Sequence, residues 1–366
     1  MDRRSFIKKA GLVTGGAATT LAAPAIAQSA PTVKWRLTSA FPKSLDTIFG
    51  AADTFAKAVS EATDGKFQIQ TFANGEVLPL AGIVEGVQKS TVEMAHTASY
   101  YYFGIDPTFA FGTAVPFGLN PRQQNAWNYY GGGVDMMNEF YKKYNIYGLP
   151  MGNTGTQMGG WYRKEINTPA DLNGLKMRIG GFAGTVLAKL GLVPTQVAGG
   201  DIYPSLEKGT IDAAEWVGTY DDAKLGFQKV AKYYYYPGWW EGGAMLHLFV
   251  NIDRWNELPK SYQSIVRTAA TMASVDIQAQ YDPGNPAALR RLVAGGAILK
   301  PFSKEVLDAC FKAATDTYAE TSAKNADFKK VFDSIKAYRA EEYLWYQVAD
   351  ATFDSYMASQ QRAGAL

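Results

Sequence analysis

The chain has 366 residues, of which 47% are hydrophobic and 19% charged, with 36 basic residues against 34 acidic ones. This near-neutral balance argues against nucleic acid as a partner, because nucleic-acid binding needs an excess of positive charge. A single cysteine excludes an internal disulfide, and the presence of only two histidines argues against a zinc or iron site. A chain of this length can bury two cores, so the composition predicts two lobes.

The first residues are typical of an export signal. Residues 3–8, R-R-S-F-I-K, match a twin-arginine motif, an apolar run covers residues 10–23, and residues 25–27 offer small side chains for cleavage. Residues 1–27 are therefore predicted to be a twin-arginine signal peptide, and the mature protein is expected in the periplasm. Their removal leaves 32 basic residues against 33 acidic ones. No other stretch is long and apolar enough to predict a membrane span.

Strand and helix patterns alternate in the residues that follow, which favours an α/β fold with largely parallel strands. Apolar and polar side chains alternate in residues 33–38 and again in residues 67–71, which predicts two strands. Between them, residues 48–59 repeat apolar side chains at helical spacing. A short helix through residues 83–87 and a strand through residues 92–94 are expected next.

A short internal sequence repeat supports two lobes of similar structure. Residues 89–95, K-S-T-V-E-M-A, parallel residues 208–214, K-G-T-I-D-A-A, although the match is short enough to arise by chance. Ligands of open α/β sheets bind beyond the carboxyl ends of strands. Residues 97–103 should therefore face a cleft from the first lobe, with Tyr101 directing a hydroxyl to the ligand. Glu215 and Trp216 should face the same cleft from the second lobe.

Two apolar strands, residues 146–152 and 245–250, are predicted to cross between the lobes and to form a hinge. They divide the mature chain into lobe I, residues 28–153 with 246–285, and lobe II, residues 154–245 with 286–366. A break is expected at residues 282–286, which contain two prolines. Long amphipathic helices are expected at residues 304–322 and 329–359, and the last one carries more apolar side chains than a terminal helix usually leaves in water.

Residues 168–178, T-P-A-D-L-N-G-L-K-M-R, are typical of a turn that leads into a strand. Pro169 fixes φ in the turn, and Gly174 allows a tight return. The alternation that follows places Arg178 at the end of the strand, just before two glycines. A guanidinium in that position suits bidentate binding of a carboxylate. The competing interpretation is a surface arginine in a salt bridge.

This run, T-P-x-D-L-x-G-L-K-x-R, resembles the signature of the extracytoplasmic solute-binding proteins of TRAP transporters, which deliver a ligand to an ion-driven membrane permease. Gln157, Glu215-Trp216 and Glu241 extend the match to the subgroup that binds a 2-oxo or 2-hydroxy monocarboxylate with a metal ion. The resemblance covers essentially the whole mature chain. It implies a two-lobed periplasmic-binding-protein-like α/β fold, no enzymatic activity, and permease subunits as partners. Some members of the family form a homodimer by exchanging C-terminal helices, so the resemblance also implies a homodimer of this kind.

The resemblance also implies a ligand set for the metal. Gln157, Glu215, the backbone carbonyl of Trp216 and Glu241 would coordinate the ion. The carboxylate and 2-oxo oxygens of the ligand would chelate the same ion, in a five-membered ring. The protein ligands are all oxygens, which suits hard cations such as Na⁺, Ca²⁺ or Mg²⁺.

Other side chains are expected to contact the organic ligand. Arg178 would anchor its carboxylate, and Phe182 would pack on its short aliphatic end. Asn153, on the same strand face as Gln157 by parity, is expected to touch it as well. Trp239 and Trp240 are candidates for the pocket wall, with structural packing as the alternative.

The charge at this site bears on the identity of the metal. Two glutamates, one arginine and a bound monocarboxylate carry a net charge of −2, which is costly to bury. Na⁺ would reduce it to −1 and Ca²⁺ to zero, so charge alone favours a divalent ion, whereas the resemblance implies Na⁺. We expect Na⁺, with Ca²⁺ as the alternative.

Three functions compete for this set of residues. The favoured one is a binding protein for a pyruvate-like 2-oxo monocarboxylate, and the nearest rival is a calcium-dependent binder of lactate or another 2-hydroxy acid. The third is a hydrolase that uses Glu215 and Glu241 as an acid/base pair. The sequence has no G-x-S-x-G motif, and neither histidine neighbours the motif at residues 168–178, so the pattern favours binding over hydrolysis.

Overall fold

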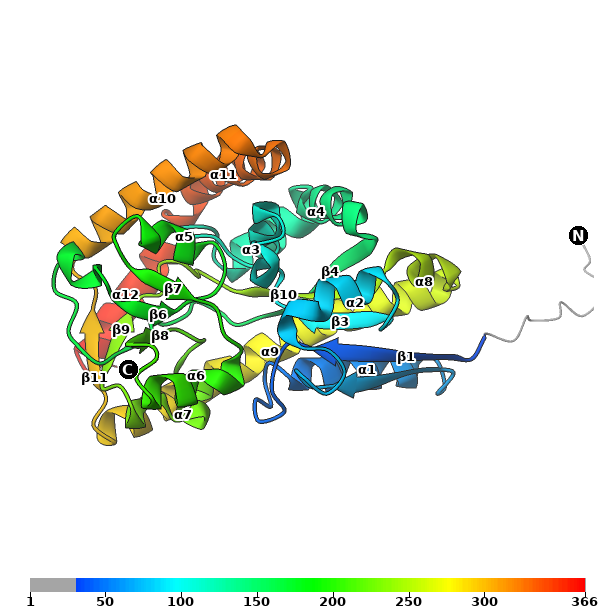
Figure 1. The fold of residues 1–366 in the computed structure, drawn as a ribbon, viewed down its shortest axis with the longest axis horizontal. Helices are drawn as coiled ribbons and strands as arrows, with labels where there is room; N and C mark the ends of the chain where they lie inside the picture. Colours follow the sequence, from blue (N-terminus) through cyan, green and yellow to red (C-terminus); the bar gives the residue numbers. More distant parts are fainter. Residues whose placement is uncertain (1–30, 366) are drawn as a thin grey trace, which may run out of the picture. The chain divides into compact units, whose positions relative to one another are not determined.

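The computed structural model describes residues 31–365, so the predicted signal peptide at residues 1–27 lies outside the described part. Residues 32–365 form two separate sheets with helices around them (Figure 1). The mixed α/β fold expected from the alternating patterns is thus confirmed. No helix within residues 31–365 has the length and apolar content needed to cross a membrane.

The first sheet, called sheet I, has five strands in the order β2-β1-β3-β10-β4. β1 runs parallel to β2 and β3, whereas β10 is antiparallel to both β3 and β4. The predicted alternation is visible in β1, where Trp35 and Leu37 are buried and the ring of Trp35 meets Phe67 edge-on at 5.0 Å. The strands are β1 (Val33–Ser39), β2 (Phe67–Phe72), β3 (Met94–Thr97), β4 (Ile146–Asn153) and β10 (Met245–Asn251).

The second sheet, called sheet II, has six strands in the order β11-β9-β5-β8-β6-β7. Its centre is aromatic, because Trp161 on β5 stacks on Tyr234 of β9 with the ring centroids 3.9 Å apart. β6 and β8 run parallel, as β1 and β3 do in sheet I. The strands are β5 (Trp161–Tyr162), β6 (Lys176–Arg178), β7 (Val193–Thr195), β8 (Ala213–Ala214), β9 (Tyr233–Tyr236) and β11 (Ile298–Pro301).

The helices before the long α9 lie around the two sheets (Figure 1). In α1, apolar side chains at helical spacing, such as Phe55 and Val59, are fully buried, as the sequence predicts. These helices are α1 (Gly50–Ala62), α2 (Ile83–Gln88), α3 (Pro121–Tyr130), α4 (Gly133–Tyr141), α5 (Ala183–Ala188), α6 (Gly199–Glu207), α7 (Thr219–Leu225) and α8 (Ile252–Glu257).

The predicted break at residues 282–286 is wrong, because α9 (Lys260–Ala294) continues through both prolines. Contacts with α7 hold the helix together here. The backbone N–H of Tyr220 donates to Asn285 Oδ1 at 3.0 Å, and the ring of Tyr220 lies so close to Gly284 that a Cβ there would come within 2.9 Å of it. Tertiary packing therefore overrides the local helix-breaking signal of proline.

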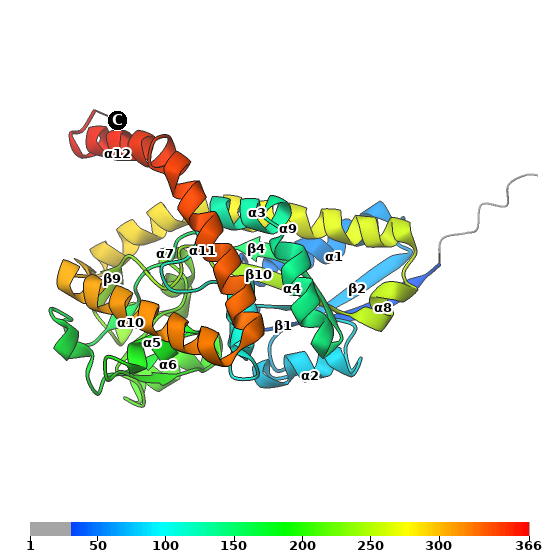
Figure 2. The ribbon, with the colours of Figure 1, turned by 90° about the horizontal axis from the view of Figure 1, so that it is seen from above.

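Two C-terminal helices, α10 (Lys304–Lys324) and α11 (Ala326–Tyr346), pack on different parts of the molecule. α10 contacts α5, whereas α11 contacts α3 and α4. The helix predicted over residues 329–359 is interrupted near Ala349, and a separate helix, α12 (Asp350–Arg362), follows. Figure 2 shows α12 leading away from both sheets, and none of its residues is buried.

The two predicted crossings, β4 and β10, pair with each other in sheet I and lead toward the loops at residues 154–158 and 238–244. The backbone N–H of Thr154 donates to the carbonyl of Ala244 at 3.2 Å, so the two loops stay side by side after the strands end. The boundaries of the two lobes stay a prediction. α11 lies on α3 and α4, which belong to the predicted lobe I, although its residues were assigned to lobe II.

Candidate functional site

The candidate site lies at the carboxyl ends of four parallel strands, two from each sheet. β1 and β3 end at Ser39 and Thr97, and β6 and β8 end at Arg178 and Ala214. The residues just beyond these ends meet, since the ring of Phe41 lies edge-on to Trp216 with the centroids 6.5 Å apart. This is the place where open α/β sheets bind ligands.

Arg178 is fully buried and paired with Glu215, so the interpretation as a surface arginine is wrong. Its Nη1 donates to Glu215 Oε1 and to the Glu215 carbonyl oxygen, the latter at 2.7 Å. The backbone N–H of Gly180 donates to the same Oε1 at 2.8 Å. The guanidinium carbon lies 4.9 Å from the ring centre of Trp216, within the range of a cation–π contact.

Gln157 and Glu241 are held together by the backbone. The N–H of Gln157 donates to the Glu241 carbonyl oxygen at 3.1 Å, and the N–H of Gly238 donates back to the Gln157 carbonyl oxygen at 2.9 Å. The N–H of Met158 donates to the carbonyl of Val217 at 3.0 Å, which ties this loop to the segment after β8. The three segments that carry the predicted metal ligands are therefore brought together.

The electrostatics of the site show an excess of negative charge. Burial, followed by the nearby charge of Glu215, raises the pKa of Glu241 well above its usual range, although a hydrogen bond from Tyr100 and the charge of Arg178 oppose the rise. Burial also raises the pKa of Glu215, against the pull of Arg178. Two buried carboxylates thus share one arginine, and a cation would relieve the imbalance.

Four buried polar atoms on the side chains of Gln157, Arg178, Glu215 and Glu241 have no hydrogen-bond partner, and the indole Nε1 of Trp216 beside them has none either. Three are acceptors, Gln157 Oε1, Glu215 Oε2 and Glu241 Oε2, and the fourth is a donor, Arg178 Nη2. Buried polar atoms are rarely left unpaired, because each one costs free energy. A hard cation would satisfy the three oxygens, and a ligand carboxylate would satisfy the guanidinium nitrogen. The residues present therefore fit a metal ion together with an anion.

This donor set differs from the clusters typical of transition metals. Within residues 31–365 no three or more His, Cys, Asp or Glu side chains come together in a way that could hold a metal. The candidate site offers two carboxylates and one amide, which suits Na⁺ or Ca²⁺ better than zinc, and the backbone carbonyl of Trp216 as a further ligand stays a prediction.

Tyr100 reaches the polar groups more directly than the predicted Tyr101. The Tyr100 hydroxyl hydrogen-bonds to Glu241, and its ring fills the space beside Gly180 and Gly181, where a Cβ on Gly181 would come within 1.9 Å of the ring. Tyr101 stacks on Tyr100 with the centroids 4.8 Å apart, and burial raises the pKa of its hydroxyl to about 12. A ligand contact of Tyr101 stays a prediction.

The structure places Phe182 and Asn153 among other residues of the protein. The ring of Phe182 packs on Tyr318 and Phe328 of α10 and α11, at centroid distances of 5.4 and 5.3 Å. Asn153 Nδ2 donates to Gln124 Oε1 at 2.7 Å, and its Oδ1 accepts from the N–H of Gly155. The ligand contacts predicted for these two residues stay predictions.

The parity argument for Asn153 is wrong, because Asn153 and Gln157 do not share a strand. β4 ends at Asn153, and Gly155 with φ +75° turns the chain before Gln157. Both tryptophans follow the packing alternative: Trp239 stacks on Phe117 at 5.0 Å, and Trp240 lies edge-on to Phe302 at 6.1 Å.

Sequence reasoning placed Tyr100 at the cleft, within residues 97–103, but it missed two residues of this site, Phe41 and Gln196. Phe41 follows the carboxyl end of the first predicted strand, so the rule applied to residues 97–103 would also have found it. Gln196 had no sequence signal. Its Nε2 donates to the Tyr101 carbonyl oxygen at 2.8 Å, and its Oε1 accepts from the N–H of Gly181 at 3.4 Å, so it joins the two sides of the site.

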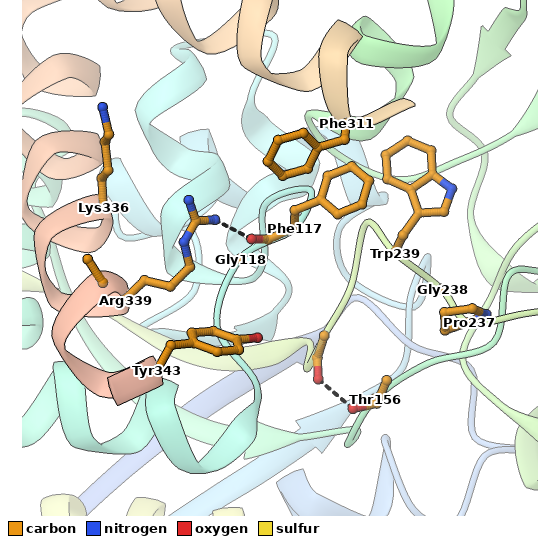
Figure 3. A pocket seen from close by; sticks show the side chains of 12 residues that line it. Phe117, Gly118, Thr156, Pro237, Gly238, Trp239, Phe311, Lys336, Arg339 and Tyr343 are labelled. Atoms are coloured by element: carbon orange, nitrogen blue, oxygen red, sulfur yellow. Dashed lines mark hydrogen bonds between the residues drawn. The ribbon is translucent and has the colours of Figure 1, made fainter. Parts of the chain in front are cut away.

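A separate groove of about 630 Å³ lies beside α10 and α11 (Figure 3). Phe117, Trp239, Phe311 and Tyr343 line it, and Arg339 donates to the Phe117 carbonyl oxygen at its edge. None of the predicted ligand or metal residues lines this groove. Thr156, Gly238 and Gly242 also line it, so the groove lies between the C-terminal helices and the loops that carry Gln157 and Glu241.

Comparisons with known proteins bear on this arrangement. Residues 38–325 match the model of the DctP family, described as bacterial extracellular solute-binding protein, family 7. The chain is 46% identical to a monocarboxylate 2-oxoacid-binding periplasmic protein of Nostoc sp., over 99% of this chain and all of that one.

Two solved structures are also similar to this chain. A TRAP transporter solute-binding protein from Bordetella bronchiseptica is 52% identical, with a TM-score of 0.90 over 91% of this chain and 99% of that one. It is a mixed-occupancy dimer with copurified calcium and picolinate in its active site. A TRAP periplasmic solute-binding protein from Pseudoalteromonas atlantica, 40% identical, has a TM-score of 0.86 over 88% of this chain and 99% of that one. It holds sodium and pyruvate.

Proposed function

The chain belongs to family 7 of the bacterial extracellular solute-binding proteins, the extracytoplasmic receptors of TRAP transporters, and we propose that its ligand is a pyruvate-like 2-oxo monocarboxylate held by a metal ion and Arg178. Members of this family bind a solute and deliver it to the membrane permease, so they are not enzymes. The observation that carries the ligand assignment is the set of four unpaired buried atoms described above.

Each unpaired atom has a place in this function. Gln157 Oε1, Glu215 Oε2 and Glu241 Oε2 would hold the cation, together with the backbone carbonyl of Trp216. The bound cation supplies the positive charge that lets an anion enter beside two glutamates. Arg178 Nη2 remains free to donate to the ligand's carboxylate, because Nη1 is already committed to Glu215.

We propose Na⁺ as the resident ion, with Ca²⁺ as the alternative. One similar structure holds sodium with pyruvate and another holds calcium with picolinate, so the family framework accepts either ion. Picolinate places a ring nitrogen where pyruvate has its 2-oxo oxygen, next to a carboxylate, so both ligands can form a five-membered chelate ring. This shared chemistry favours a 2-oxo acid over an acid without a second donor.

The direct test of this function is titration calorimetry on the mature protein after metal removal. Pyruvate and lactate are each titrated in sodium buffer, in choline buffer, and in choline buffer with added calcium. Tight pyruvate binding only with a cation supports the proposal, and elemental analysis identifies the ion held after purification. Equal pyruvate affinity in all buffers would exclude the metal-bridged site, and a preference for lactate with calcium would establish the 2-hydroxy acid alternative.

We also propose a homodimer made through the C-terminal helices. α12 buries none of its residues, and large apolar side chains are exposed along the end of α11 and α12, including Leu344, Trp345, Val348, Phe353 and Tyr356. One similar structure is a dimer. Light scattering coupled to size-exclusion chromatography should give twice the chain mass, and a paired Val348→Glu/Phe353→Glu variant should give a monomer. A monomeric wild-type protein at micromolar concentration would contradict the proposal.

Export through the twin-arginine pathway completes the proposal. The paired arginines at positions 3 and 4 and the apolar run behind them support it, and the family is extracytoplasmic. Replacing both arginines with lysine should keep the precursor inside the cell, as shown by fractionation. Normal export of that variant would contradict this route.

A further inference from the structure

Phe41 is an aromatic side chain of the sheet I side that lies against the proposed ligand-binding residues. It is only 1% exposed, and its ring lies edge-on to Trp216 at a centroid distance of 6.5 Å. It also meets Tyr101 at 6.4 Å. Because Trp216 lies under the guanidinium of Arg178 at 4.9 Å, Phe41 touches the stack that carries the proposed carboxylate anchor.

The backbone and the neighbours of Phe41 hold its ring in place. Its N–H donates to Ser39 Oγ at 3.3 Å, and its carbonyl oxygen accepts from the N–H of Asn74 at 3.2 Å. The ring of His96 lies edge-on to it at 5.4 Å, and the His96 Nε2 is itself within 3.1 Å of the Met151 carbonyl oxygen. The side chain of Phe41 is therefore closely packed, and its neighbour His96 is held by a hydrogen bond of its own.

The distribution of charge decides which end of a ligand can face the ring of Phe41. The four groups proposed to hold the charged head all come from residues 157–241, namely Gln157, Arg178, Glu215 and Glu241. The groups contributed from beyond β1 and β3 are the aromatic side chains Phe41, Tyr100 and Tyr101. The head faces the charged groups, so the alkyl end is left to face the aromatic ones, where apolar burial is favourable.

From this arrangement we infer that Phe41 sets the length of alkyl chain that the site accepts. Its ring closes the aromatic end and favours a short 2-oxo acid over a longer, branched one. A ligand with a second carboxylate at its far end is rejected for a different reason, because that charge would be buried against aromatic rings without a partner. The inference rests on the proposed function and deepens it.

The test is a comparison of ligand affinities across variants at this one position. Wild-type protein, Phe41→Leu and Phe41→Ala are saturated with the resident cation. Pyruvate, 2-oxobutyrate and 4-methyl-2-oxopentanoate are then titrated by calorimetry. Relative to wild type, Phe41→Ala should shift the affinity ratio of 4-methyl-2-oxopentanoate to pyruvate at least tenfold toward the longer acid. Phe41→Leu should shift it by less, and cation affinity without organic ligand should stay unchanged in both variants.

Phe49→Ala serves as the matched control. Phe49 is a buried phenylalanine of the same lobe, 5% exposed, eight residues further along the chain. It makes no ring contact with Trp216 or Tyr101 within residues 31–365. Its removal creates a comparable cavity away from the site, so it should keep the wild-type affinity ratio.

Two outcomes would overturn the inference. One is a wild-type affinity ratio in both Phe41 variants, and another is an equal loss of affinity for all three acids, which would mark Phe41 as merely structural. If Phe41→Ala does not fold, Phe41→Leu decides, because leucine keeps most of the apolar volume. Wild-type protein that binds none of the acids would instead refute the proposed function itself, which is a separate result.

Discussion

The two sides of the candidate site are built from different chemistry. The side formed by residues 157–241 supplies two carboxylates, an amide and a guanidinium, all nearly fully buried. The side beyond β1 and β3 supplies the aromatic rings of Phe41, Tyr100 and Tyr101. The comparison teaches that affinity for the ligand's charged head and selectivity for its alkyl chain depend on different residues. Variants of the polar side should change affinity for every ligand, whereas variants of Phe41 should change the selectivity among ligands.

The largest effect is expected from Glu215→Ala on the polar side. It removes a metal ligand and leaves Arg178 buried without its partner, a loss of about 3–5 kcal/mol for a broken buried ion pair. Chemical denaturation should show this loss of stability, and calorimetry should show no pyruvate binding. Glu85→Ala, which breaks an exposed pair with Lys89, is the control and should change stability little. Equal stability losses in the two variants would contradict the polar side as described.

Arg178→Lys should weaken binding of every 2-oxo acid by about 1.5–3 kcal/mol, the range for hydrogen bonds to charged groups. Lysine keeps the charge but loses the two-pronged geometry and the contact with the Trp216 ring. Calorimetry with pyruvate and 2-oxobutyrate gives the measurement, and Arg36→Lys is the matched surface control. Wild-type affinity in Arg178→Lys would rule out Arg178 as the carboxylate anchor.

Lowering the pH should destabilise the folded protein through two buried histidines and stabilise it through one buried aspartate. Burial lowers the pKa of His96 to about 4 and of His247 to about 3, so the folded state binds these protons less readily than the unfolded chain. Stability from these histidines is present above pH 6.5 and is lost as the pH falls. Each histidine contributes on the order of 2 kcal/mol to that loss between pH 7 and pH 5.

The pH dependence of stability that comes from Asp222, behind the polar side, has the reverse sign. Burial raises its pKa to about 7, so its contribution to stability grows as the pH falls from about 8 toward 4. His247→Leu should therefore flatten the acid-side loss of stability, and Asp222→Asn should steepen it. Denaturation midpoints measured from pH 8 to pH 5 test both variants, and parallel pH profiles for wild type and the two variants would contradict these pKa shifts.

The smallest expected effect is a difference in ligand affinity between variants of two adjacent tyrosines of the aromatic side. Tyr100→Phe removes the hydrogen bond to Glu241 but keeps the ring beside Gly180 and Gly181. Ligand affinity should fall by only about 0.5–1.5 kcal/mol, because the lost hydrogen bond acts on the ligand through the position of Glu241. Tyr101→Phe should change affinity less, because the Tyr101 hydroxyl pairs with Tyr100 and not with Glu241. The opposite ranking in calorimetry would restore the prediction made from the sequence.

Much of the polar side could be predicted from the sequence, because its residues sit in local patterns. Arg178 ends a strand marked by alternation and by a proline–glycine turn, and Glu215-Trp216 follow a strand that echoes residues 89–95. The two echoed strands, β3 and β8, do hold corresponding places beside β1 and β6. Strand ends are readable because side-chain alternation is a local property of the chain.

The tertiary structure decided what depends on contacts between distant residues. Whether Tyr100 or Tyr101 reaches Glu241, and whether Phe41 closes the site, depends on side-chain directions fixed by partners more than 100 residues away. The sequence by itself determined the family and the α/β class and predicted the charged anchors, since these follow from motifs and periodicity. Only tertiary packing decided three other features, because there long-range contacts outweigh local preference. These are the continuation of α9 through two prolines, the position of Phe41 and the four unpaired atoms.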